Sequence, residues 1–183
     1  GTKMFVIGSN GDDVNEYTLS TAFDVSTASF VDSFDISSQE LGPRDVAFSN
    51  DGLKMFVVGV RGDDVNEYTL STAFDVSTAS FVDSFDISSQ EDSPTGLAFN
   101  NDGTKMFVAG NAGDDINEYT LSTGFDVSTA SFVDSFSVAS QDTTPNGLSF
   151  NSDGTKMYVV GNQGNDINAV SYTHLTLPTM LPV

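Results

Sequence analysis

Apolar and polar residues alternate with a period of two along much of the chain, and the middle of the sequence shows this best. Residues 96–100 alternate in this way, and residues 105–110 form an almost continuous apolar run. Alternation predicts a half-buried strand, whereas a short continuous apolar run predicts a strand buried on both faces. Two further alternating segments follow at 116–122 and 131–138. This stretch therefore predicts four consecutive strands.

Turn signals separate the predicted strands. Asn and Asp form Asx turns and Gly accepts a positive φ, so Asn-Asn-Asp-Gly at 100–103 favours a tight hairpin over a short calcium loop. Ile116 is out of phase with Tyr119 and Leu121, which predicts a β-bulge near Ile116. Because no segment shows helical spacing of its apolar residues, we expect an all-β protein.

The same pattern returns every 51 residues. Its anchor, Gly-x-Lys-Met-(Phe/Tyr)-Val, begins at Gly1, Gly52, Gly103 and Gly154. Four antiparallel strands repeated at such a period are typical of β-propeller blades, because neighbouring blades cover each other's apolar faces. We therefore predict a β-propeller fragment of about three and a half four-stranded antiparallel blades. A linear β-solenoid is the alternative, although its rungs are usually shorter.

The repeat also predicts the domain organisation. We expect a partial propeller over residues 1–168, composed of repeats 1–51, 52–102, 103–153 and an incomplete 154–168. From residue 169 the sequence AVSYTHLTLPTMLPV replaces the expected EYTLSTAFD and contains His174, the only histidine. SYTHLTLPT resembles a peptide found at the ends of environmental gene predictions when adaptor DNA is translated. We interpret residues 169–183 as a non-native tail, and a genuine terminal cap is the alternative.

Two stretches resemble known repeat proteins. PTGLAFNNDGTKMFVAG, at 94–110, resembles the strand-turn-strand core of bacterial β-propeller repeats of the WD40-like, YVTN and NHL types. VNEYTLSTAFDVSTASFVDSFDISSQ, at 14–39, resembles the continuation in repeat proteins of environmental bacteria. The resemblance covers residues 1–168 and implies the propeller fold. It implies no single activity, since such propellers include binding modules, adhesins and enzymes. Trp is absent, so the WD dipeptide is missing.

Charge and composition narrow the function classes. Twenty-six acidic residues against six basic ones give a formal net charge of −20. Such a surface repels phosphate, so we expect neither nucleic-acid binding nor attachment to anionic lipid. No apolar run reaches the roughly 18 residues of a membrane span, so we expect no membrane insertion. Cysteine is absent and the repeats contain no histidine, which argues against Cys- or His-based nucleophilic catalysis here.

Paired aspartates occur in the loop before the third strand of each of the first three repeats. The pairs are Asp12 and Asp13, Asp63 and Asp64, and Asp114 and Asp115. In a propeller this loop shares a face with the connection that contains Glu40, Glu91, Asp92 and Asp142, so we expect a strongly negative rim. The paired aspartates are candidate ligands for Ca²⁺, which prefers carboxylate and carbonyl oxygens. The alternative is that Asp beside Gly forms turns and keeps the protein soluble.

The first two repeats differ mainly in loops of this same face. The differences gather at 41–46 against 92–97, and at Ser9 and Asn10 against Val60 and Arg61. The candidate partner-binding residues are therefore Ser9, Asn10, Val60, Arg61, Glu91 and Asp92.

Two other residue types recur in every complete repeat. The anchor lysines Lys3, Lys54, Lys105 and Lys156 follow the hairpin turn, and we expect them to be solvated and to protect the hairpin from edge pairing. Tyr17, Tyr68 and Tyr119 are aromatic residues that stack on sugars in some proteins. Their regular recurrence favours core packing instead.

Together these features favour a non-enzymatic repeat scaffold or binding module that presents an acidic loop face to a protein or glycan, with Ca²⁺ as a candidate cofactor. We expect it in a secreted or cell-surface bacterial protein. The alternative is a fragment of a propeller enzyme, a carbohydrate lyase or hydrolase whose catalytic residues lie in missing blades. We also expect the chain to self-associate through uncovered blade flanks.

Overall fold

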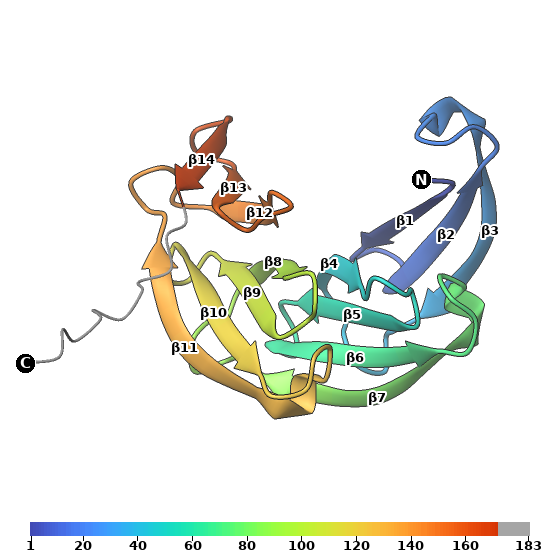
Figure 1. The fold of residues 1–183 in the computed structure, drawn as a ribbon, viewed down its shortest axis with the longest axis horizontal. Coiled ribbons are helices and arrows are strands. Elements are labelled where there is room, and N and C mark those ends of the chain that lie inside the picture. Colours follow the sequence, from blue (N-terminus) through green and yellow to red (C-terminus); the bar gives the residue numbers. More distant parts are fainter. Residues whose placement is uncertain (172–183) are drawn as a thin grey trace, which may run out of the picture.

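The computed structural model describes residues 1–171, and its strands form four antiparallel sheets that follow one another around an arc (Figure 1). Each sheet corresponds to one 51-residue repeat, so the predicted all-β partial propeller is confirmed. We refer to the sheets as blades 1 to 4 in chain order. Residues 172–183, which include most of the tail predicted at 169–183, lie outside the described residues. Residues 167–171 continue blade 4 as its last described strand.

The strands of each blade are consecutive in sequence and in space. Blade 1 contains β1 (Lys3–Gly8), β2 (Asp13–Leu19) and β3 (Ala28–Asp35). Blade 2 contains β4 (Pro43–Phe48), β5 (Lys54–Gly59), β6 (Asp64–Leu70) and β7 (Ala79–Asp86). Blade 3 contains β8 (Pro94–Phe99), β9 (Lys105–Gly110), β10 (Asp115–Leu121) and β11 (Ala130–Ser137). Blade 4 contains β12 (Pro145–Phe150), β13 (Lys156–Gly161) and β14 (Ile167–Ser171).

A single turn of 3-10 helix precedes the outer strand of the first three blades. These turns are η1 (Val25–Thr27), η2 (Val76–Thr78) and η3 (Val127–Thr129). Each is capped by the preceding aspartate, whose side chain accepts a hydrogen bond from the serine N–H two residues later, as is usual for a short helical turn. Within residues 1–171 no helix has the length and apolar character that crossing a membrane requires.

The hydrophobic core lies between blades rather than inside any one blade. One cluster joins blades 1 and 2, a second joins blades 2 and 3, and a third joins blades 3 and 4. Edge-to-face ring pairs contribute at two boundaries, between Phe34 and Tyr68 and between Phe85 and Tyr119. A blade without neighbours would leave these side chains in water, so the blades stabilise one another.

The predicted bulge at Ile116 is wrong in position. Ile116 pairs regularly with Phe136, and the register shifts instead between Glu118 and Tyr119, where β11 contains the extra residue. Ile116 is out of phase because β10 is buried on both faces. It packs in the cluster toward blade 4, whereas Tyr119 and Leu121 pack in the cluster toward blade 2.

Candidate functional site

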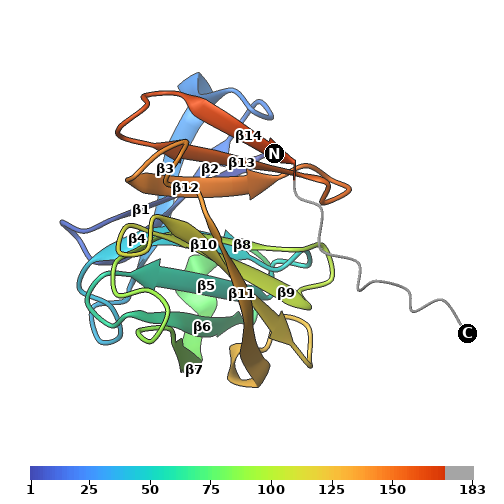
Figure 2. The same cartoon turned by 90° about the vertical axis from the view of Figure 1, so that its left-hand side faces the viewer.

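The turns of the blades lie at the two opposite ends of the strands (Figure 2). One end, here called the connection face, has the turn before the third strand of each blade and the connection from each outer strand to the next blade. These two kinds of loop touch: the Ile87 N–H donates to the Asp63 carbonyl at 2.9 Å. The other end, the hairpin face, has the Asn-Asp-Gly and Ser-Asp-Gly turns and the 3-10 turns.

Three of the four acidic residues of the connections are buried, contrary to the expectation of an exposed negative rim, and only Asp92 is exposed. Glu40 and Glu91 are 1% exposed and Asp142 is 2% exposed. The Glu91 carboxylate accepts hydrogen bonds from the backbone N–H groups of Ser93, Ala112 and Gly113, at 2.7, 3.0 and 3.3 Å. It therefore holds the turn between β9 and β10. Glu91 was predicted to contact a partner at the surface, which is wrong because its carboxylate is used inside the protein.

The same arrangement recurs at the other two connections. Glu40 accepts from the N–H groups of Gly42, Arg61 and Gly62. Asp142 accepts from those of Thr144, Gln163 and Gly164, and these hydrogen bonds hold the pKa of Asp142 below its usual value. A carboxylate with several N–H donors is a strong local clamp. The residue that faces the carboxylate must be glycine, because a Cβ on Gly110 would overlap the Glu91 carboxyl group.

The first aspartate of each pair serves in the turn. Asp12, Asp63 and Asp114 have φ values of 48, 50 and 50°, a left-handed conformation that Asp tolerates better than most residues. The second aspartates, Asp13, Asp64 and Asp115, each accept a hydrogen bond from the side-chain amide of the asparagine two residues later. Within residues 1–171 no group of three or more acidic or histidine side chains is placed to hold a metal ion. The Ca²⁺ prediction thus gains no geometric support and stays a prediction.

Partial burial changes the acidity of two of these carboxyl groups. Loss of hydration raises the pKa of Asp64 and of Asp115 above the usual value, and the adjacent asparagine amides only partly offset this. These groups therefore take up a proton at a higher pH than exposed aspartates do.

The segments that differ between the first two repeats lie together in space. The Val60 N–H donates to the Gly42 carbonyl at 3.1 Å, and a Cβ on Gly42 would lie 3.2 Å from Arg61 Cγ. The corresponding bond in blade 3 joins Asn111 to Ser93, also at 3.1 Å. We call residues 41–46 and 60–61 the variable patch of blade 2. Ser9, Asn10 and Asp92, the other predicted partner-binding residues, are exposed on the same face.

Both arginines of the chain, Arg44 and Arg61, belong to the variable patch and are exposed. Leu41, three residues before Arg44 in the sequence, is 58% exposed. The other basic residues are the four anchor lysines, so this patch carries the positive charge that is not part of the repeat. The sequence shows that both arginines fall in segments that differ between the repeats. Only the structure shows that these two segments, 41–46 and 60–61, touch each other.

We predicted that the anchor lysines are solvated, but Lys3, Lys54 and Lys105 form ion pairs instead. Lys54 Nζ lies 2.6 Å from Glu67 Oε1 and also donates to the Phe125 carbonyl of blade 3 at 2.6 Å. Glu67 Oε2 accepts from the Val127 N–H at 2.9 Å. Lys3 and Glu16 bind the corresponding turn of blade 2 in the same way. The pair therefore joins consecutive blades.

The recurring tyrosines pack in the core in the two internal blades, as their regular placement indicated. Tyr68 and Tyr119 are 0% exposed, so neither ring is available to stack on a sugar. Burial raises the pKa of both hydroxyl groups, and nearby carboxylates add to the rise.

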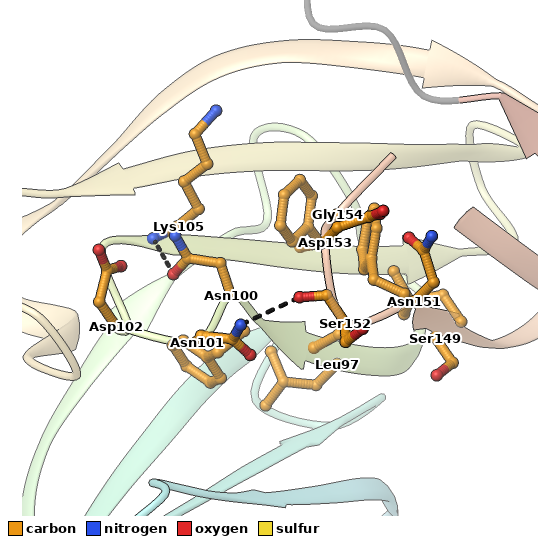
Figure 3. Close-up of a pocket in the computed structure, with 15 residues that line it drawn as sticks. Leu97, Asn100, Asn101, Asp102, Lys105, Ser149, Asn151, Ser152, Asp153 and Gly154 are labelled. Carbon is orange, nitrogen blue, oxygen red and sulfur yellow. Dashed lines mark hydrogen bonds between the residues drawn. The ribbon is translucent and has the colours of Figure 1, made fainter. Parts of the chain in front are cut away.

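A cleft of about 660 Å³ lies between blades 3 and 4 toward the hairpin face (Figure 3). Its walls include Phe107, Phe150 and Gly154, with Lys105 at its edge. The side-chain amide of Asn101 donates to the Ser152 carbonyl at 3.2 Å and links the two turns that border the cleft (Figure 3).

The sequence matches no protein-family model and no curated protein. Among solved structures, the provisionally assigned 6-phosphogluconolactonase of Bacteroides uniformis matches with a TM-score of 0.66 and 13% identity, over 96% of this chain and 49% of its own. The periplasmic gluconolactonase of Pseudomonas aeruginosa matches with a TM-score of 0.62 and 17% identity, over 94% and 47%. The β-propeller domain of Cps50 (Swd1) from Myceliophteria thermophila gives 0.56 and 14%, over 92% and 52%.

These similarities establish the fold class as a β-propeller. The chain spans about half the length of the solved structures it matches. At such low identities the likeness extends to the fold and not to the activities of those proteins.

Proposed function

We propose that the chain is part of a binding scaffold and that the variable patch of blade 2 contacts the partner. The partner is a protein or a glycan that carries a carboxylate group. Arginine guanidinium groups bind carboxylates with paired, charge-assisted hydrogen bonds, and Arg44 and Arg61 lie on a protein whose net charge is otherwise strongly negative.

One observation carries this proposal. Residues 11–40 and 62–91 are identical, whereas the differences between the two repeats include most of two loop segments that touch each other. Substitutions concentrated in two loops that touch change what that surface binds while leaving most of the blade unchanged. This arrangement favours recognition of a partner over a repeated catalytic centre, because near-identical blades offer near-identical environments for acids and bases.

A propeller enzyme is the second candidate function. The observation that favours it is the raised pKa of Asp64 and Asp115, because a half-buried carboxyl group that releases its proton at a higher pH than an exposed one is a candidate general acid. The fold shared with two lactonases agrees with this candidate but does not establish it.

A third proposal concerns association of the chain with itself. Phe23 is 83% exposed, Val25 is 69% exposed and Ile167 is 73% exposed, and such apolar side chains favour association. Light scattering over a concentration series tests this: a rise in mass with concentration is expected, and a constant monomer mass contradicts it.

The main proposal is tested by screening the purified chain against acidic peptides, neutral peptides and oligosaccharides with and without uronic acids, while assaying gluconolactone hydrolysis in parallel. The scaffold proposal predicts saturable binding to carboxylate-bearing probes and no lactone hydrolysis above the buffer rate. Hydrolysis that is lost in Asp64→Asn would support the enzyme candidate instead. Absence of binding to every probe would contradict the scaffold proposal.

A further inference from the structure

Asparagine or aspartate stands directly before glycine at five places in the chain. Because glycine has no Cβ, its backbone nitrogen reaches the carbonyl carbon of the preceding side chain more easily than that of any other residue. Attack by this nitrogen closes a five-membered succinimide ring. The five dipeptides are Asn10-Gly11, Asp51-Gly52, Asp102-Gly103, Asn146-Gly147 and Asp153-Gly154.

The three Asp-Gly dipeptides lie in the hairpin turns, where both reacting groups are held. In each turn the glycine N–H donates to the carbonyl three residues earlier, at 2.9–3.1 Å. The aspartate side chain accepts from the N–H two residues later, at 3.0 Å. Hydrogen bonds from hydroxyl and backbone N–H groups lower the pKa of all three aspartates. An ionised carboxylate is a poor electrophile, so these turns resist ring closure.

The dipeptide Asn146-Gly147 lies in a regular strand. Both residues belong to β12, and Gly147 is paired with Val160 of β13. The side chains of a strand stand roughly perpendicular to the sheet, which keeps the Asn146 amide away from the next backbone nitrogen. Ring closure here requires the strand to open first.

The remaining dipeptide, Asn10-Gly11, lies in the turn between β1 and β2 and is exposed. Within residues 1–171 no group accepts a hydrogen bond from the Gly11 N–H, and the Asn10 side chain has no hydrogen-bond partner. Both residues line a shallow hollow of about 390 Å³, so water reaches the turn. The two reacting groups are therefore free to meet.

The other three blades show how this turn is usually held. There the glycine equivalent to Gly11 donates its N–H to the buried carboxylate of the connection, at distances of 3.1, 3.3 and 2.8 Å in blades 2, 3 and 4. Removing a proton from such a nitrogen would create a negative charge beside a carboxylate, which is unfavourable. Blade 1 combines a preceding asparagine with a glycine nitrogen that is not held in this way.

We propose that Asn10 is a self-modification site, at which the side chain deamidates by attack of the Gly11 nitrogen. The new bond joins Gly11 N to Asn10 Cγ, the bond from Cγ to Nδ2 breaks, and the amide leaves as ammonia with the proton from the Gly11 N–H. Water then opens the succinimide at either carbonyl and leaves aspartate or isoaspartate, so no oxidant or reductant is needed.

The modification changes the connection face of blade 1. It adds a negative charge next to Asp12 and Asp13, and isoaspartate also lengthens the turn backbone by one carbon atom. Asn10 is one of the candidate partner-binding residues, but the modification proceeds in the protein alone and does not depend on the proposed function.

The first experiment uses the original chain, folded and in urea, at mildly alkaline pH. Proteolysis and tandem mass spectrometry follow the conversion of each asparagine and separate aspartate from isoaspartate. In the folded protein we expect Asn10 to convert at least about tenfold faster than Asn146, because the strand must open before Asn146 reacts. In urea the two rates should approach each other, since both side chains precede glycine.

A matched variant tests the role of the carboxylate. Val60→Ser with Arg61→Asn makes residues 60–91 identical in sequence to residues 9–40, whereas Glu40 still accepts from the Gly62 N–H. Ile7 and Val58 distinguish the two fragments by mass. In the folded variant we expect position 61 to convert at least about tenfold more slowly than Asn10, because a charge-assisted hydrogen bond must break first. In urea the two rates should be equal.

Three results would overturn the proposal. They are an absence of conversion at Asn10, conversion of Asn146 as fast as Asn10 in the original folded chain, and equal rates at Asn10 and position 61 in the folded variant. The comparison with Asn146 needs no substitution, so it decides the proposal even where the double variant fails to fold.

Discussion

Lys54 in blade 2 reaches the carbonyl oxygen of Phe125 in blade 3 with a hydrogen bond of 2.6 Å, although 71 residues separate them in the chain. The same ammonium group is paired with Glu67, which is 2% exposed and holds the Val127 N–H with its second oxygen. Two charged side chains of one blade thus satisfy a carbonyl and an N–H of the next. This contact makes the boundary between blades specific as well as apolar.

Loss of this lysine should destabilise the protein measurably. Lys54→Met leaves the buried Glu67 carboxylate without its counter-ion, and we expect the free energy of unfolding to fall by about 2–3 kcal/mol, less than for a fully buried pair because the lysine is partly exposed. Urea denaturation followed by tyrosine fluorescence measures this change.

The chain provides a matched control for that experiment. Lys156 occupies the same position in blade 4 and is exposed, and the residue in the register of Glu67 there is Ala169. Lys156→Met should therefore change the free energy of unfolding by less than about 0.5 kcal/mol. Equal effects of the two substitutions would show that the ion pair does not join the blades.

The buried carboxylates of the connections give a second prediction. Gly110→Ala would push a methyl group into the Glu91 carboxyl group and displace it from its three N–H donors. We expect a loss of about 1–3 kcal/mol or more, as is typical of an overpacked site. Gly8 has the same position in blade 1, but a Cβ there would meet no atom within 4 Å. Thermal melting of Gly8→Ala should resemble the original chain, and a large loss in both variants would contradict this explanation.

The pH dependence of stability should reveal the half-buried Asp45. This carboxyl group accepts hydrogen bonds from the N–H groups of Val46 and Leu97, but burial dominates and raises its pKa. A raised pKa in the folded state means that the folded protein binds the proton more tightly than the unfolded chain. The contribution of Asp45 to stability is therefore most favourable below its unfolded pKa and is lost as the pH rises through its folded pKa.

Asp45→Asn isolates this effect because it resembles the protonated side chain. Melting temperatures of both proteins between pH 3 and pH 7 provide the measurement. We expect the original chain to gain stability relative to Asp45→Asn as the pH falls. A constant difference, or a relative loss at low pH, would mean that the hydrogen bonds and not burial control the pKa of Asp45.

The strands were largely predictable from the sequence because alternation and turn signals act locally. In blade 3 the predicted segments at 96–100, 105–110, 116–122 and 131–138 correspond to Pro94–Phe99, Lys105–Gly110, Asp115–Leu121 and Ala130–Ser137. The boundaries differ by at most two residues. The 3-10 turns were missed because three residues are too few to show a periodic pattern.

The roles of the charged residues were less predictable because they depend on contacts between distant segments. Lys54 pairs across β5 and β6 with Thr69, so Glu67 lies diagonal to it, within reach of a long side chain. That signal was available once the hairpin register was assumed. The burial of Glu91 had no local signal, because it depends on how closely the connection approaches the turn of residues 112–113.

The claim that the variable patch recognises the partner is tested most directly by exchanging its arginines for the residues of blade 3. Arg44→Thr with Arg61→Ala introduces the residues found at Thr95 and Ala112. For the best carboxylate-bearing probe from the screen, calorimetry should show at least about a tenfold loss of affinity, as expected when charged hydrogen bonds are removed. The melting temperature should not change. Lys156→Met, which removes positive charge elsewhere, should bind the probe as the original chain does. Unchanged affinity in the double variant, or an equal loss in Lys156→Met, would contradict the account.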